Sequence, residues 1–156
     1  MLRITKESDY AIMLLASMAD RPRGAIHTAR EAAAQTGLPL PMVSKILRGL
    51  AREKVLVSHR GVSGGYSLER PAEETSVAAV IRAVEGPISI VQCGAEPGAC
   101  DQEPVCPTRL NWVRISREVE RTLERIPISA MAPSGDRLGL SDGPAPVRGG
   151  SASIGR

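Results

Sequence analysis

Residues 37–54, with the sequence GLPLPMVSKILRGLAREK, decide the fold that we expect for this chain. Gly37 ends one helical pattern, and the next begins with Pro41 in its first turn, where proline is tolerated because the amide groups there lack helical partners anyway. At 100° per residue, the apolar side chains of this second helix fall on one face. They are Val43, Ile46, Leu47 and Leu50. We therefore expect this face to pack into a core.

The opposite face of the same predicted helix is basic. Lys45, Arg48 and Arg52 gather there, and Ser44 adds a hydroxyl group that can donate a hydrogen bond. One packing face and one basic face are typical of a recognition helix, which enters the major groove of DNA. We predict that these four side chains contact phosphates or base edges.

Two shorter helical patterns precede this stretch. The first covers residues 5–19, where Thr5 is the predicted N-cap. The second starts at Thr28, which has the spacing of a capping box with Glu31, and it stops at Gly37. Short helices joined by a tight turn with glycine are typical of a helix-turn-helix motif.

A β-hairpin is predicted directly after the basic helix. Residues 55–58 favour a strand, the glycine-rich residues 61–65 must turn, and residues 66–68 favour a return strand. The hairpin forms the wing of a winged helix-turn-helix and offers three further candidate DNA contacts, which are His59, Arg60 and Ser63. We therefore predict a mainly α fold with a small β-hairpin, in which a winged helix-turn-helix DNA-binding domain occupies residues 1–86.

Composition agrees with a DNA-binding protein of the cytoplasm. Residues 1–70 hold eleven Lys or Arg and six Asp or Glu, and the sequence pI of about 9.0 is compatible with an anionic partner. With no Phe and one Trp, the core must be aliphatic. No basic and apolar leader opens the chain, and no apolar run approaches the ~20 residues of a membrane span. We expect a cytoplasmic protein that binds double-stranded promoter DNA and no membrane.

Three cysteines crowd into one stretch, at Cys93, Cys100 and Cys106. Cytosolic thiols stay reduced, so this crowding favours metal or redox chemistry over a disulfide. Zinc sites usually pair cysteines two to four residues apart, whereas a Gly- and Pro-rich loop with wider spacing can wrap an iron–sulfur cluster. From the spacing alone, an iron–sulfur cluster, a zinc ion, thiol-based redox sensing and the absence of a cofactor all stay open.

Residues 107–126 form the last helical pattern, with apolar residues spaced by three and four. Twenty helical residues span about 30 Å, and so long a helix in a small protein needs another surface to cover it. We therefore predict a long dimerisation helix within residues 107–131, after a cysteine loop at 87–106 and before a disordered Gly- and Pro-rich tail at 132–156. Trp112 is predicted to be a structural residue of the core or the dimer interface.

Four stretches together resemble the Rrf2 family of transcriptional regulators, which includes IscR, NsrR and RirA. They are MLRITKESDY at residues 1–10, GLPLPMVSKIL at 37–47, RGVSGGY at 60–66 and the cysteine loop. The resemblance covers residues 1–131. Within the family, the EGPI motif at 85–88, the cysteine spacing and the pair Asn111-Trp112 look most like the regulator of the SUF iron–sulfur cluster assembly system.

The resemblance implies a homodimer with an iron–sulfur cluster, of four or two irons, on each subunit's cysteine loop. It makes Cys93, Cys100 and Cys106 the expected ligands. IscR-type members take a fourth ligand from a His three residues after the last Cys, but this chain has Arg109 there. NsrR-type members take it from an Asp at the start of the partner subunit's first helix, and Asp9 matches that position. Asp9 is our candidate fourth ligand, and its alternative role is that of an ordinary first-turn acid.

The predicted function is therefore regulation, as a repressor, of SUF cluster assembly genes, with cluster occupancy setting the affinity for DNA. The alternative is a nitric oxide, iron or redox-responsive regulator of the same family with other target genes. An enzyme is not expected, because no His base lies near the cysteines and no phosphate-binding glycine loop is present. A metal-independent adaptor that binds protein is a third interpretation.

Overall fold

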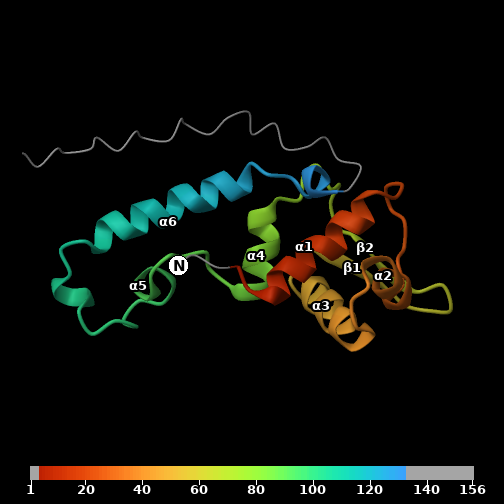
Figure 1. The fold of residues 1–156 in the computed structure, drawn as a ribbon, viewed down its shortest axis with the longest axis horizontal. Helices are drawn as coiled ribbons and strands as arrows, with labels where there is room; N and C mark the ends of the chain where they lie inside the picture. The colour runs from red at the N-terminus through yellow and green to blue at the C-terminus, as the bar shows by residue number, and fades with distance from the viewer. Residues whose placement is uncertain (1–3, 133–156) are drawn as a thin grey trace, which may run out of the picture.

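The computed structural model describes residues 4–132, and Figure 1 shows their arrangement. The helices are α1 (Lys6–Ala19), α2 (Ala29–Thr36), α3 (Leu40–Arg52), α4 (Val77–Glu85), the short α5 (Gln92–Ala95) and α6 (Arg109–Glu124). Two strands, β1 (Leu56–His59) and β2 (Gly65–Leu68), pair antiparallel, and 3-10 turns form η1 (Glu103–Val105) and η2 (Ile128–Met131). This confirms the predicted mainly α fold with one hairpin. The predicted disordered tail lies, except for residue 132, outside the described residues.

The helix ends follow the sequence signals closely. Thr5 caps α1 by accepting a hydrogen bond from the backbone N–H of Ser8. Thr28 and Glu31 form the complete capping box at the start of α2, and Gly37 ends that helix with a φ of 71°, in the left-handed region that glycine adopts without strain. Local chemistry therefore fixes where the first two helices begin and where the turn before α3 lies.

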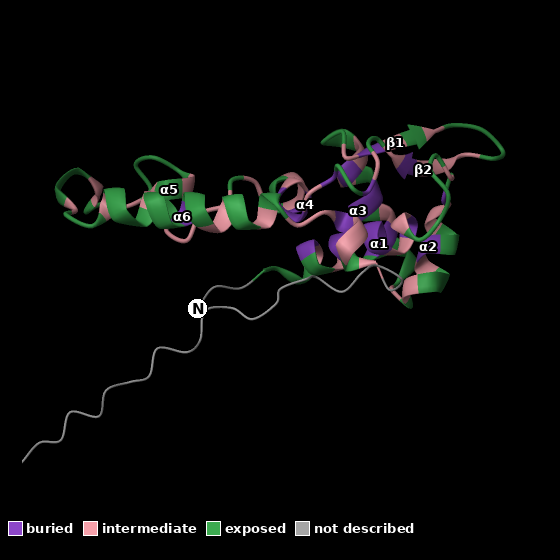
Figure 2. Cartoon of the chain, turned by 90° about the horizontal axis from the view of Figure 1, so that it is seen from above, coloured by how far each residue is buried: buried purple, intermediate pink, exposed green. Residues whose placement is uncertain are grey.

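The core is aliphatic, as the lack of Phe predicts. Figure 2 shows the buried residues concentrated in α1, α3 and α4, while α5 and α6 are mostly exposed or half-buried. The fully buried side chains include Leu14, Leu15, Leu47, Leu50 and Val80. The apolar face predicted for α3 is thus the face that packs, which turns the basic face outwards.

The wing is short and is anchored by a third segment. In the register of β1 and β2, Leu56 lies opposite Leu68 and His59 lies opposite Gly65. The backbone of His27 adds a bridge to Tyr66, with N–H···O distances of 2.8 and 2.9 Å. Gly65 is required beside this bridge, because a Cβ there would lie 2.5 Å from the carbonyl oxygen of His27.

Helix α6 extends away from the compact part formed by α1 to α4, and the cysteine loop with α5 lies along its first half (Figure 1). Arg82 of α4 holds the other half through ion pairs with Glu120 and Glu124, the latter at 3.0 Å. None of the helices in residues 4–132 combines the length and the apolar character needed to cross a bilayer.

The structure divides the predicted segment 107–131 in two. Helix α6 has 16 residues, a length of about 24 Å, and it ends at Glu124, close to the end of the predicted helical pattern at 107–126 and before the end of the segment at 131. After Pro127 the chain returns to the core, where Ile128 is fully buried and donates a 2.8 Å backbone hydrogen bond to Thr75. The end of the segment therefore packs with the compact part formed by α1 to α4, because Ile126 and Ile128 contribute to its core.

Candidate DNA interface and cysteine loop

The basic face of α3 is exposed. Lys45, Arg48 and Arg52 all point their charged groups to solvent, while Ser44 beside them is half-buried. Each cation has an acceptor within the chain. Lys45 pairs with Glu7 at 3.1 Å and Arg52 pairs with Glu53 at 3.2 Å. Arg48 donates a 3.1 Å hydrogen bond to the carbonyl oxygen of Ser44. Exposed contacts of this kind are weak, so phosphate groups can replace them.

The wing presents the other candidate contacts. Arg60 and Ser63 are exposed at its tip. His59 is half-buried, and its Nε2 lies 2.8 Å from the hydroxyl group of Ser67 inside the hairpin. Arg60 and Ser63 are therefore free to reach a groove, whereas His59 must give up an internal hydrogen bond before it contacts DNA.

A tight connection joins the wing to α3. Lys54 has a φ of 58°, and among the described residues it is the one residue other than glycine with a positive φ. The backbone N–H of Val55 then donates to the carbonyl oxygen of Leu50 at 2.9 Å. This turn fixes the wing close to the end of the recognition helix. Lysine gives no signal for a left-handed turn, so the sequence analysis did not find it.

The three cysteines are free thiols, all half-buried, within one loop. Cys93 lies in α5, Cys100 lies shortly before η1, and Cys106 follows η1 directly. No group of three or more His, Cys, Asp or Glu side chains within residues 4–132 is placed to hold a metal ion. The cysteines thus share a loop without being gathered, and Asp9, exposed in the first turn of α1, does not join them in the single chain.

Two residues that the sequence analysis did not single out, Glu103 and Thr108, make hydrogen bonds inside the cysteine loop. Glu103 accepts a 2.6 Å hydrogen bond from the backbone of Gly98 and forms a 2.7 Å ion pair with Arg109. Hydrogen bonds from the hydroxyl group and the backbone of Thr108 lower the pKa of the Cys106 thiol, and the backbone and charge of Arg109 lower it further. The thiol of Cys106 is therefore easier to deprotonate than an ordinary cysteine thiol.

Arg109 occupies the position three residues after the last cysteine. Its Nε is buried and has no hydrogen-bond partner among the described residues. A buried N–H group without an acceptor is costly, so this atom is suited to an anionic acceptor that enters the loop.

One face of α6 is apolar. Ile115, Val119 and Leu123 line a shallow groove there, and the lining is almost entirely apolar. Trp112 and Ile115 are both about two-fifths exposed, so neither belongs to the core of the single chain. Ile115 is exposed, whereas Val119 is half-buried and Leu123, at the end of the groove, packs against the core formed by α1 to α4.

Comparison with known proteins gives one consistent result. The chain matches the Rrf2 family, described as an iron-dependent transcriptional regulator, over residues 4–134. It is 33% identical over 91 residues to a putative HTH-type transcriptional regulator of Mycobacterium tuberculosis, covering 58% of this chain and 56% of that protein. The chain therefore spans little more than half the length of that relative.

Two further comparisons extend along most of the chain. The HTH-type transcriptional regulator IscR of Serratia proteamaculans is 25% identical over 141 residues, covering 90% of this chain and 85% of that protein. The structure of CymR, the global cysteine regulator of B. subtilis, has a TM-score of 0.64 at 22% identity and covers 87% of this chain and 100% of the other. These proteins are transcriptional regulators, not enzymes, which confirms the predicted winged-helix fold and the predicted class of function.

Proposed function

This chain belongs to the Rrf2 family of transcriptional regulators, and from this premise we propose that it is a homodimeric, cytoplasmic repressor of SUF iron–sulfur cluster assembly genes that senses through an iron–sulfur cluster. The observation that carries the proposal is that one chain combines an exposed basic helix face with three free thiols on one loop. The two features lie in different parts of the molecule, so the loop would alter DNA binding by favouring one arrangement of the chain over another.

The DNA contacts that we propose come from α3 and the wing. The exposed cations of α3 suit the negative charge of a phosphate backbone, and Ser44 lies among them. Arg60 and Ser63 extend the same contact at the wing tip. His59 is the weakest of the seven proposed contacts, because its ring already has a hydrogen-bond partner in Ser67.

The dimer that we propose forms through α6. An apolar groove runs from the exposed Ile115 past Val119 to Leu123, which packs against the core. Its exposed part is suited to a second copy of the same helix, since the contact would bury apolar surface on both chains. Two winged helix-turn-helix domains related by a two-fold axis would then bind the two halves of a partly palindromic site.

The donor set fits an iron–sulfur cluster in its chemistry, although the single chain does not assemble it. Three thiols lie on one Gly- and Pro-rich loop, and the lowered pKa of Cys106 eases formation of the thiolate that ligates iron. The buried Nε of Arg109 lacks an acceptor, which an anionic group in the loop would supply. We propose that Cys93, Cys100 and Cys106 hold the cluster once the loop closes around it.

A fourth ligand must come from elsewhere in this account. Arg109 cannot ligate iron, because a guanidinium group stays protonated at any ordinary pH and offers no lone pair. We propose Asp9 from the partner subunit, since this carboxylate is exposed and has no role in the core of its own chain. Cross-subunit ligation would couple the cysteine loop of one chain to the first helix of the other.

The proposal of SUF genes as targets is supported by the EGPI motif, the cysteine spacing and the pair Asn111-Trp112. A thiol-based redox sensor of the same family with other targets is the second candidate, and the lowered pKa of Cys106 favours it. The two candidates differ in what a single Cys substitution removes, which is a cluster in one case and a reactive thiol in the other.

Footprinting on promoter DNA tests the function. Protein prepared without oxygen, with and without its cluster, would be added to promoters of cluster assembly genes and to unrelated promoters. We expect one protected, partly palindromic site on the former, with an affinity that differs between the two preparations and a Cys100→Ala variant that behaves as the cluster-free form. Protection of neither class of promoter by either preparation would overturn the proposal.

A further inference from the structure

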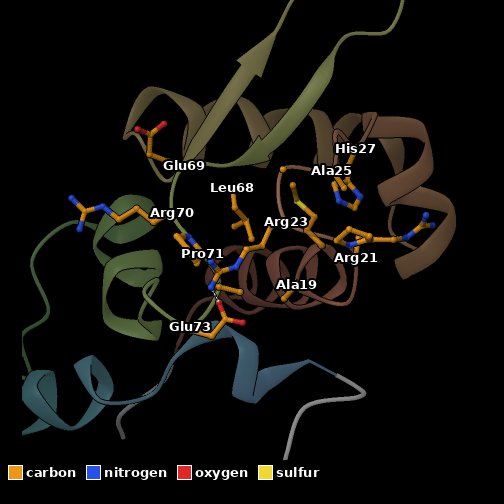
Figure 3. Close-up of a pocket in the computed structure, with 14 residues that line it drawn as sticks. Ala19, Arg21, Arg23, Ala25, His27, Leu68, Glu69, Arg70, Pro71 and Glu73 are labelled. Atoms are coloured by element: carbon orange, nitrogen blue, oxygen red, sulfur yellow. Dashed lines mark hydrogen bonds and ion pairs between the residues drawn. The ribbon is translucent and has the colours of Figure 1, made fainter.

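A pocket of about 260 Å³ lies beside the wing, apart from both the DNA face and the cysteine loop. Its walls are the end of α1 with the loop that follows it, and the segment 68–73 that leads from β2 towards α4 (Figure 3). None of the proposed DNA contacts and none of the cysteines lines this pocket. The proposed function therefore leaves it without a role.

His27 is the unusual residue in the pocket wall. Only 5% of it is exposed, and it is one of five buried polar residues in the described part of the chain, with Ser8, Ser67, Thr75 and Ser116. The hydroxyl groups of the other four all make hydrogen bonds within the protein. No hydrogen bond joins the ring of His27 to another described residue, so its nitrogens are available to water or to a small ligand in the pocket.

The charged side chains that line the pocket give it a small excess of positive charge, which suits an anion. Arg21, Arg23 and Arg70 line the pocket, against Glu69 and Glu73. Figure 3 shows the side chain of Arg23 directed at Glu73, and this exposed pair, at 3.5 Å, is weak enough to be exchanged. Burial lowers the pKa of His27 and the charge of Arg21 lowers it further, so the ring is neutral at pH 7 with one N–H group to donate.

Size and lining limit what can enter. Met18, Leu68 and Ala72 supply an apolar wall beside the charged rim. A volume of about 260 Å³ lies just below the roughly 300–1,000 Å³ of ordinary ligand pockets, so it suits a molecule of a few heavy atoms and is too small for a nucleotide.

We propose that this pocket binds a small organic anion, a carboxylate or phosphate with a short apolar part, which accepts a hydrogen bond from the ring of His27 and is attracted by Arg21 and Arg23. The backbone of His27 pairs with Tyr66 of β2, so the ligand contacts a residue that holds the wing. A bound anion would therefore restrict the motion of the wing. This consequence for DNA rests on the proposed function, whereas binding of the anion does not.

Nuclear magnetic resonance of the histidine rings tests the proposal on the full chain. The chain has two histidines, His27 and His59, so each ring can be followed separately. Sodium butyrate and inorganic phosphate would be titrated in turn, with sodium chloride at equal ionic strength as the control. We expect saturable shifts of the His27 signals at one anion per chain and a raised pKa of His27, because a bound anion favours the charged ring.

Variants separate the pocket from general anion binding. A protein with Arg21→Gln and Arg23→Gln should bind at least about tenfold more weakly, as expected when charge-assisted contacts are lost. A matched protein with Arg117→Gln and Arg125→Gln, changed on and after α6, should bind as the parent does. Tighter binding of butyrate would identify a carboxylate with an apolar part, and tighter binding of phosphate a phosphorylated ligand. Shifts that only follow ionic strength, or that persist in the first variant, would overturn the proposal.

Discussion

Thr5, the N-cap of α1, and Glu85, the last residue of α4, are joined by a hydrogen bond of 2.8 Å from Oγ1 of Thr5 to Oε1 of Glu85. The same carboxylate oxygen accepts hydrogen bonds from the hydroxyl group of Ser8 and from the backbone of Thr5. This junction ties the helix start that carries Asp9 to the end of α4, two residues before the cysteine loop begins. A change in the loop can therefore reach the start of α1 through Glu85.

We predict that Glu85→Gln destabilises the fold by about 1 kcal/mol at pH 7, a value discounted for the exposure of the side chain. Burial alone would raise the pKa of Glu85, but hydrogen bonds from Ser8 and Thr5 outweigh it, and the pKa is lowered. The carboxylate therefore contributes stability above the unfolded value of 4.5, and this stability is lost as the pH falls through the lowered pKa. The free energies of unfolding of parent and variant, measured with urea, should become equal at low pH. A loss of stability that is equal at pH 7 and at low pH, or that Glu74→Gln also produces, would contradict this account.

Arg48→Gln should weaken DNA binding without changing the fold. Removing one phosphate contact should make the slope of log K against log salt concentration less negative by about 1. It should also lower the affinity by roughly tenfold. Fluorescence anisotropy over a range of salt concentrations measures both. Arg125→Gln removes the same charge just after α6 and should leave both quantities as in the parent. Equal losses in the two variants would show that α3 is not the contact surface.

Ile115→Glu should convert a dimer into a monomer. The substitution places a charge in the apolar groove of α6, and burying an unpaired carboxylate costs several kcal/mol. Sedimentation velocity gives the oligomeric state directly. Val62→Glu changes an exposed apolar residue of the wing and serves as the control. A parent protein that is already monomeric at micromolar concentration would rule out this use of α6.

Ile128→Ala should lower the free energy of unfolding by about 2–5 kcal/mol, the usual cost of a cavity in a core. The side chain is fully buried, although it lies after α6 in the sequence. Met131→Ala, at an exposed position of the same turn, should cost far less. Chemical denaturation of the two variants compares them, and similar losses would mean that residues 126–131 do not form part of the core.

Local patterns predicted most of the DNA-binding domain. The apolar stripe of α3, the caps at Thr5 and Thr28 and the glycine turn at Gly37 all lie where the sequence placed them, because each depends on neighbouring residues. The return of Ile128 to the core was missed, since a helical spacing of apolar residues does not reveal which surface they cover. The burial of Ile128 depends on tertiary packing after Pro127.

The candidate site was predicted less completely. The sequence identified Cys93, Cys100 and Cys106, yet spacing says nothing of how closely the thiols approach, and the single chain does not gather them. The contacts of Glu103 with Gly98 and Arg109 were not foreseen, because an ion pair within an irregular loop has no periodic pattern. The pocket beside His27 likewise depends on two segments that are far apart in the sequence, residues 18–27 and 68–73.

Iron and acid-labile sulfide content, measured with a visible spectrum on protein purified without oxygen, is the most direct test of the central claim. Cluster ligation predicts near-stoichiometric iron and sulfide in the parent, their loss in each of Cys93→Ala, Cys100→Ala and Cys106→Ala, and an altered spectrum in Asp9→Ala. Ser63→Ala, at the wing tip, should keep the parent's spectrum. Colourless protein that holds zinc or no metal, even after anaerobic reconstitution, would contradict the claim.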